Sequence, residues 1–197
     1  MPFRSAILLI LLVSFVVSCG QQEVEEDGLV EEVFPKVELK DYDTISVEES
    51  FEFIIPNELS LATTQQINGV VAYSNLVSEV HFEVVEFPFQ DEVVESEGVD
   101  SAFLEFSDKM YEDLISNYES LDLQEQYCSR FNNKMNCYYH VQLRQAGFPK
   151  ERAISYRFVQ GDKGSYLLIF SSLKEDADLY LEMEDAIMLS FKEIKKG

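Results

Sequence analysis

The sequence predicts an α+β domain in which a mainly antiparallel sheet of six to seven strands packs against two amphipathic helices. Segments with strand and helix patterns follow one another as three strands, a helix, four strands and a helix. Because strands and helices do not alternate regularly, a parallel sheet is not expected. The 197 residues are rich in Leu, Ile, Val, Phe and Tyr, which is enough for one sizeable core.

The first three strands are expected at 51–56, 70–73 and 80–87. The first alternates apolar and polar residues and stops at Pro56, and the second and third form an antiparallel pair across a short turn. The following helix, at 101–118, is indicated by apolar residues three and four positions apart, and Asp100 or Ser101 is placed to cap it.

Four more strands are expected at 121–131, 135–144, 154–158 and 166–170. Asn132-Asn133 is a plausible hairpin turn because Asn tolerates positive φ. The segment 161–164, Gly-Asp-Lys-Gly, is the strongest turn signal in the chain. The strand after it is apolar on both faces, which is typical of a covered central strand.

The chain is predicted to end in a second helix, at 176–196. Its apolar stripe consists of Tyr180, Met183, Ile187, Phe191 and Ile194. Acidic residues come early in this segment, and Lys192, Lys195 and Lys196 come late, as the helix dipole favours.

The amino-terminal segment has the pattern of a secretory leader. Arg4 precedes an apolar run, and the small residue Ser18 precedes Cys19. This resembles the lipobox of bacterial lipoproteins, which implies a signal peptide at 1–18, cleavage before Cys19, and fatty acyl chains such as palmitate on its thiol. A membrane-spanning helix is the alternative, but the run is at the lower limit of about 17–25 residues that span a bilayer.

Residues 19–45 are expected to form an acidic flexible tether, and residues 46–197 the folded domain. Gly20 rather than Asp follows the cysteine, which by resemblance to bacterial sorting rules favours the outer membrane. The acidic run 21–27 resembles the export signal of surface lipoproteins in the Bacteroidetes group; otherwise it is a solvated spacer. A lipid-anchored protein facing either the periplasm or the cell surface is therefore expected.

The formal net charge of −22 limits the partners. Nucleic acid is not expected, because phosphates would be repelled, and anionic headgroups would be repelled as well. The membrane is therefore expected to be contacted through the lipid on Cys19. Such acidity fits calcium binding, a basic partner or simple solubility, of which solubility is the commonest cause.

Cys128 and Cys137 are predicted to form a disulfide, because an even pair in an oxidising compartment is usually bonded. A two-residue turn at Asn132-Asn133 sets the two cysteines opposite each other at a non-hydrogen-bonded position. A three-residue turn would instead set Tyr127 opposite Tyr139 and send the sulfurs to opposite faces. The pattern of apolar residues favours the register of the three-residue turn, whereas the oxidising compartment favours the register of the two-residue turn, which allows the disulfide.

The sequence contains no catalytic constellation and no metal-ligand pattern. His81 and His140 are isolated on strands, and zinc needs three or four ligands. The acidic residues of 92–100 lack the ligand spacing of an EF-hand. No catalytic residue, metal ligand or cofactor is therefore assigned.

Several strings, in their order along the chain, resemble the PsbP-like superfamily, which includes DcrB-type lipoproteins. They are Phe51-Glu52-Phe53-Ile54-Ile55-Pro56, Tyr73-Ser74-Asn75, the segment from Tyr156 through 161–164 to Tyr166, and Ser190-Phe191-Lys192. The resemblance covers about residues 46–195. It implies a PsbP-like α/β sandwich and a binding or accessory role, and it assigns no catalytic residues.

The expected function is that of a membrane-anchored envelope lipoprotein with a non-enzymatic binding or assembly-accessory role toward another envelope protein. Tyr138 and Tyr139 point to opposite faces of the sheet, so one of them is a candidate for such contacts, although packing in the core is the favoured alternative for both. One alternative is a small-ligand or metal-binding module with a pocket near 88–100, and another is a hydrolase with an unrecognised site. A concave pocket with converging polar groups would favour the ligand, and a nucleophile beside a base would favour the enzyme.

Overall fold

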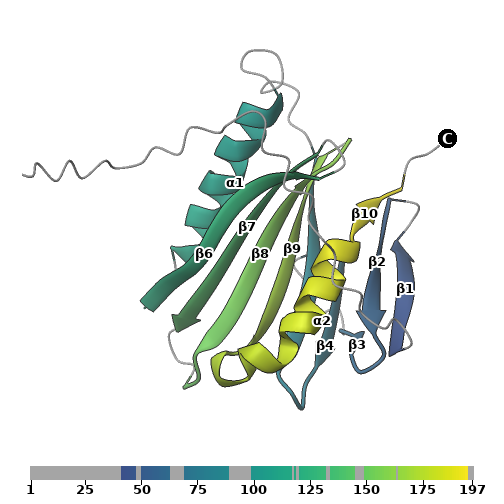
Figure 1. Cartoon of the computed structure of the whole chain (residues 1–197), viewed down its shortest axis with the longest axis vertical. Helices are drawn as coiled ribbons and strands as arrows, with labels where there is room; N and C mark the ends of the chain where they lie inside the picture. Colours follow the sequence, from purple (N-terminus) through teal and green to yellow (C-terminus); the bar gives the residue numbers. More distant parts are fainter. Residues whose placement is uncertain are drawn as a thin grey trace, which may run out of the picture.

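The chain folds around two antiparallel sheets, as Figure 1 shows for the computed structural model. The structure describes residues 41–47, 50–62, 69–88, 99–116, 118, 120–131, 134–144, 149–162 and 164–194. The large sheet has seven strands in the order β3-β4-β5-β9-β8-β7-β6. They are β3 (Ser60–Leu61), β4 (Val71–Asn75), β5 (Val80–Pro88), β6 (Ser120–Phe131), β7 (Lys134–Arg144), β8 (Arg152–Gln160) and β9 (Gly164–Leu173).

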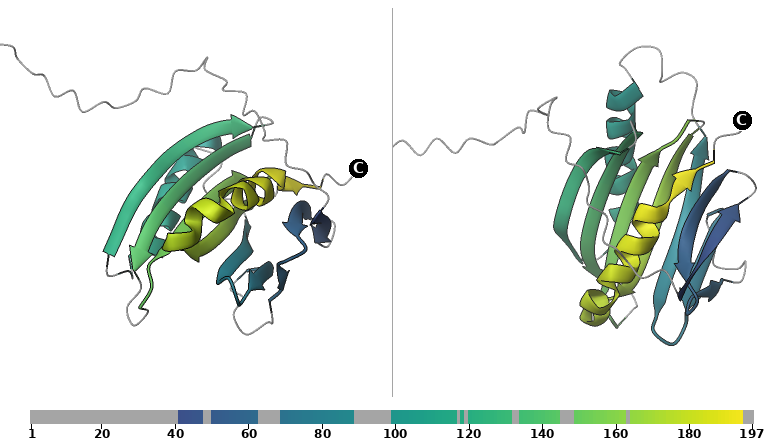
Figure 2. Two further views of the ribbon diagram at one scale, coloured as in Figure 1. Left: turned by 60° about the horizontal axis from the view of Figure 1, so that its bottom comes forward. Right: turned by 45° about the vertical axis from the view of Figure 1, so that its right-hand side comes forward.

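The two helices lie on opposite faces of the large sheet (Figure 2). Helix α1 (Val99–Ile115) covers one face. Helix α2 (Ala177–Ser190) follows the 3-10 turn η3 (Lys174–Asp176) and covers the other face. Beside α2 lies the small sheet, ordered β1-β2-β10 and made of β1 (Tyr42–Val47), β2 (Phe51–Pro56) and β10 (Lys192–Glu193). The predicted α+β class is confirmed.

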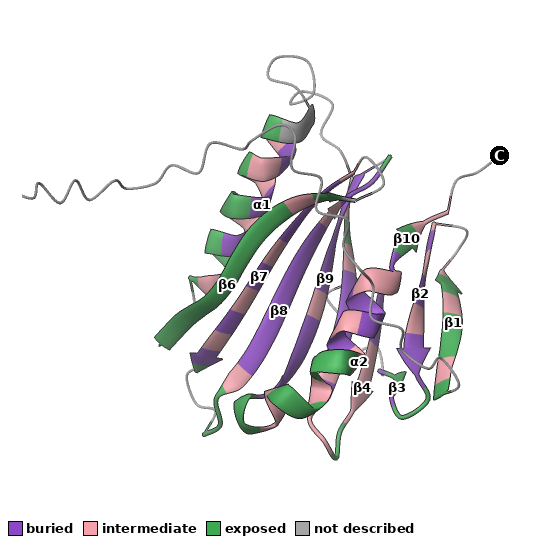
Figure 3. Ribbon diagram, viewed as in Figure 1, coloured by how far each residue is buried: buried purple, intermediate pink, exposed green. Residues whose placement is uncertain are grey.

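Burial changes across the large sheet (Figure 3). Strands β8 and β9 are buried at most positions because elements pack on both of their faces, as the apolar pattern of 166–170 predicts. Strand β6 is the opposite case, since its residues 120–128 are all exposed. Along β7, the buried residues of one face alternate with half-buried residues such as Tyr138 and His140 on the other.

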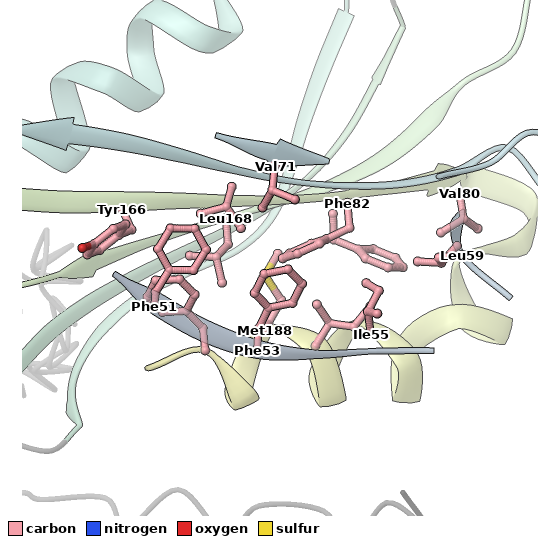
Figure 4. Packing of buried hydrophobic residues seen from close by; sticks show 14 residues of the cluster. Phe51, Phe53, Ile55, Leu59, Val71, Val80, Phe82, Tyr166, Leu168 and Met188 are labelled. Atoms are coloured by element: carbon pink, nitrogen blue, oxygen red, sulfur yellow. The ribbon is translucent and has the colours of Figure 1, made fainter. Parts of the chain in front are cut away.

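One part of the core joins α2 and the small sheet to the large sheet (Figure 4). The Phe53 ring of β2 lies 5.2 Å from the Phe82 ring of β5 and 6.1 Å from the Tyr73 ring of β4. The fully buried aromatic residues in this part of the core come from alternating strand positions. Because successive residues of a strand point to opposite faces, these alternate rings all face the same layer. Burial of such rings is the main source of stability for this layer.

The other part of the core lies between α1 and strands β7 and β8. The Tyr111 ring of α1 stacks on the Tyr139 ring of β7 at 4.2 Å between centroids. The Tyr139 hydroxyl donates a hydrogen bond of 2.6 Å to Asp108, so its polar end is satisfied at the rim. Helix α1 begins at Val99, before the predicted capping residues Asp100 and Ser101.

The predicted last helix is too long. Helix α2 ends at Ser190, and Phe191 is extended with φ −61° and ψ 129°. The Ser190 hydroxyl donates to the carbonyl of Ile187 and accepts from the Ile54 amide of β2. The chain then pairs with β2 as β10, so the late lysine expected at 192 lies on a strand. The free edge of β2 supplies hydrogen bonds that compete with another helical turn.

The folded part also begins earlier than the predicted boundary at 46. Residues 42–45, assigned to the tether, belong to β1 and pair with β2, with Thr44 opposite Ile54. As an edge strand, β1 is largely exposed, which explains its weak apolar signal. The proposed leader, Cys19 and the tether as far as residue 40 lie outside the described residues, as do Glu92, Glu95 and Glu97. No helix in the described ranges is long and apolar enough to cross a membrane.

Candidate functional site

The β6–β7 hairpin has the register of the two-residue turn. Phe131 lies opposite Lys134, and Cys128 lies opposite Cys137. The two cysteines form a disulfide with a Cα–Cα distance of 4.1 Å. The three-residue register, which places Tyr127 opposite Tyr139, is wrong: Tyr127 lies opposite Tyr138. The apolar pattern misled because β6 is an exposed edge whose two faces are not constrained by burial.

On the side of the hairpin opposite α1 lies a polar and aromatic surface, which we call the open face. It consists of Glu125, Tyr127, Tyr138, His140 and Gln142. The Tyr127 ring is 42% exposed and lies 5.2 Å from the Tyr138 ring. Helix α2 borders this face without covering β6 (Figure 3). Of the two tyrosines considered from the sequence, Tyr138 lies on this face and Tyr139 is buried under α1.

A hydrogen-bonded network lies where the open face meets α2. The Tyr138 hydroxyl donates to Glu184 Oε1 at 2.8 Å and lies 3.1 Å from Ser155 Oγ. His140 Nδ1 lies 2.8 Å from the same Ser155 oxygen. Burial raises the pKa of the Glu184 carboxyl to about 7, although the hydrogen bonds from Ser155 and Tyr138 oppose this shift. Burial also lowers the pKa of His140.

The contact between Ser155 and His140 resembles the first half of a nucleophile–base pair. However, Ser155 is only 1% exposed, and its hydroxyl also contacts Tyr138. A substrate carbonyl cannot approach an oxygen enclosed in this way between strands and α2. The network is therefore better suited to holding α2 against the sheet than to attacking a substrate.

A cavity of about 290 Å³ lies at the carboxyl end of α2, beyond the open face. Its lining includes Lys134, Asn136, Arg157, Tyr166, Phe191 and Glu193. The buried Arg157 guanidinium donates a hydrogen bond of 3.0 Å to the carbonyl of Met188 in the last turn of α2. Glu193 accepts from the Asp162 amide at 2.7 Å, and Lys134 pairs with the Asp162 carboxylate. This is a concave site with converging polar groups, whereas most of 88–100, where a pocket was expected, lies outside the described residues.

Within the described ranges, no three His, Cys, Asp or Glu side chains converge as metal ligands. His81 instead lies 3.4 Å from the carboxylate of Glu83 on the same strand. His140 takes part in the network with Ser155. Neither histidine has the ligand set that zinc requires.

The sequence pattern did not identify three residues of this region as parts of a site, namely Ser155, Arg157 and Glu184. For Glu184 a signal existed, because it falls on the apolar stripe of α2, four residues after Tyr180 and three before Ile187. An acidic residue on such a stripe needs a buried partner. The sequence does not show that Tyr138 of a distant strand supplies it.

Comparison with known proteins finds similarity only at the level of structure. No family model matches the chain, and no curated protein matches its sequence. The cyanobacterial PsbP protein (CyanoP) of Synechocystis is similar, with 11% identity and a TM-score of 0.56 over 81% of this chain and 96% of that protein. LpqN of Mycobacterium tuberculosis has 7% identity and a TM-score of 0.52 over 78% and 91%. The fold of this chain is therefore PsbP-like.

Proposed function

We propose that this chain is an envelope lipoprotein, anchored through lipid on Cys19, that binds and assists another envelope protein through the open face. The observation that carries the proposal is the part of the open face around the exposed ring of Tyr127, which neither described helix covers and which lies on a hairpin fixed by a disulfide. Exposed tyrosines on rigid elements are typical contacts of protein interfaces, because they bury a large area at a low cost in entropy. The burial of Ser155 supports binding rather than hydrolysis.

The envelope location is proposed from the leader pattern and supported by one neighbour. The solved LpqN structure is described as that of a protein involved in cell envelope biogenesis, so this fold serves the envelope elsewhere. In the present chain, the 21 residues 20–40 lie between Cys19 and Asp41, the first described residue. Such a tether, anchored at the outer membrane, would let the domain reach partners in the periplasm or at the cell surface.

A second candidate function is binding of a small ligand in the cavity at the end of α2. Its size and its converging polar groups favour this candidate. The bond from Arg157 to Met188 disfavours it, because the buried cation of the cavity is already engaged by the helix. Partner binding on the open face therefore remains the preferred function.

The anchor is tested by the variant Cys19→Ala. The protein should move from the membrane fraction to the soluble fraction and lose metabolic labelling with palmitate, because acyl chains contribute about 0.8 kcal/mol for each buried methylene. The double variant Cys128→Ser/Cys137→Ser is the control, and it should keep the label. Continued full labelling of Cys19→Ala would contradict the anchor.

The open face is tested by Tyr127→Ala. With photoreactive benzoylphenylalanine in place of Glu125, which lies opposite His140 on the open face, illumination of intact cells should give a protein adduct, and Tyr127→Ala should lower its yield about tenfold. The control is Leu76→Ala, because Leu76 is 82% exposed on the distant β4–β5 turn. Equal adduct yields from both variants would show that the open face is not the binding surface.

A further inference from the structure

The two edges of the large sheet differ in what they present to solvent. One edge is β3, which has only two residues and so offers little backbone for pairing. The other edge is β6, which has twelve residues and pairs only with β7 among the described strands. Leu121, Leu123 and Tyr127 of β6 are 38–42% exposed. A long exposed edge with apolar side chains is a template for another strand.

The register shows which backbone groups of β6 face outward. In an antiparallel pair, residues that bond the neighbouring strand alternate with residues whose N–H and C=O point away from it. The short Cα–Cα distance of 4.1 Å identifies Cys128 and Cys137 as a non-hydrogen-bonded pair, in which the backbone N–H and C=O groups point away from the neighbouring strand. Gln126, Cys128 and Arg130 therefore direct their N–H and C=O groups toward the open edge, whereas Tyr127 and Ser129 bond β7.

The outward-facing segment is already held in strand geometry. A β-bulge between Leu123 and Glu125 interrupts the pairing of β6, which leaves residues 125–131 as a regular run. At about 3.3 Å a residue, this run spans about 23 Å. The disulfide at position 128 fixes it to β7 before any partner arrives, which lowers the entropy lost on binding.

The charge around this edge indicates the chemistry of the partner. Helix α1 packs on β7 and carries the exposed acidic residues Glu105, Asp108, Glu112 and Asp113, against a single lysine at 109. Asp108 accepts a hydrogen bond from Tyr139, which is the register partner of Gln126, so this acidic surface adjoins the edge. On β6 itself, Asp122 and Glu125 add two exposed carboxylates, against one exposed arginine at 130. A second copy of a chain with net charge −22 would be repelled here, whereas a cationic segment would be attracted.

We propose that the outer edge of β6 is a strand-addition site, at which an extended, Lys- or Arg-bearing segment of the partner protein joins the large sheet as an eighth strand. This proposal rests on the proposed function, and it identifies the kind of segment through which the partner protein binds. Backbone hydrogen bonds from Gln126 and Cys128 hold the segment, and its alternate side chains lie on the open face beside Tyr127.

The test compares Gln126→Pro with Gln126→Ala in the full-length chain in intact cells, again with benzoylphenylalanine at Glu125. Proline removes an outward N–H and leaves the bonds to β7 intact, and edge strands tolerate it at such positions. Gln126→Pro should lower the adduct yield about tenfold, whereas Gln126→Ala should keep it. If Gln126→Pro fails to fold, Arg130→Pro with Arg130→Ala repeats the test at another outward position.

The outcomes separate this inference from the proposed function. Equal adducts from the proline and alanine variants, with Tyr127→Ala still lowering the yield, would overturn strand addition and leave binding on the open face. Absence of any adduct from the parent chain would overturn both. Mass spectrometry of the adduct should find a Lys- or Arg-bearing segment; an acidic segment, or a second copy of this chain, would overturn the inference.

Discussion

Replacing Phe191 by alanine should lower the free energy of unfolding by about 3–5 kcal/mol. Phe191 is only 7% exposed, and its ring lies 5.2 Å from the Phe51 ring and 5.1 Å from the Tyr166 ring. It therefore joins the end of α2 to both sheets, and its removal leaves a cavity where three elements meet. Denaturant unfolding of the purified protein gives the difference in free energy.

The control for Phe191→Ala is Leu181→Ala, on α2 itself. Leu181 is 52% exposed, so its truncation should change the free energy of unfolding by no more than about 0.5 kcal/mol. A loss as small as this for Phe191→Ala would show that the chain after α2 does not pack on the small sheet in solution.

Replacing Glu184 by glutamine should remove a fall in stability that the parent protein shows as pH rises. The pKa of the buried Glu184 carboxyl is about 7 in the folded state, above its ordinary value of 4.5. A carboxyl with a raised folded pKa contributes stability that is fully present below pH 4.5 and is lost as pH rises through 7. The full change is about 3 kcal/mol, at about 1.4 kcal/mol for each pKa unit.

His140, in the same network, acts in the opposite direction. Its pKa is lowered by burial, so its contribution is present above its ordinary value of 6.5 and is lost as pH falls below it. Glu125 and Asp185 also act electrostatically on Glu184. The difference between the parent and Glu184→Gln isolates the Glu184 contribution, because glutamine can still accept the hydrogen bond from Tyr138.

Unfolding free energies at pH 5, 6, 7 and 8 measure this difference. Relative to Glu184→Gln, the parent should be most stable at pH 5 and least stable at pH 8. Glu182→Gln removes an exposed carboxylate from the same helix and is the matched control. Parallel pH profiles for the parent and Glu184→Gln would show that the carboxyl is solvated and that α2 does not hold it against Tyr138.

Much of the large sheet could be predicted because local patterns carry it. Residues 166–170 of β9 are all apolar, so the burial of this strand on both faces was readable from its own residues. Strand β8 alternates apolar residues with polar ones such as Ser155 and Arg157, so the burial of its second face was not readable in the same way. The spacing of Phe103, Phe106 and Met110 predicts α1 for the same reason. The stretch at 192–194 misled, because its pattern fits a helix while the free edge of β2 favours a strand.

The amino-acid sequence by itself determined the α+β class and the order of the main strands and helices, since each depends on periodicity within a short segment. It left two registers open for the hairpin that carries Cys128 and Cys137, and the structure decided between them. Only the tertiary structure decided that Tyr138, His140, Ser155 and Glu184 meet beside α2 and that β6 is the edge strand of the large sheet among the described strands. These features depend on register and on which faces the helices cover. Both are set by packing between segments far apart in the chain, which no local pattern encodes.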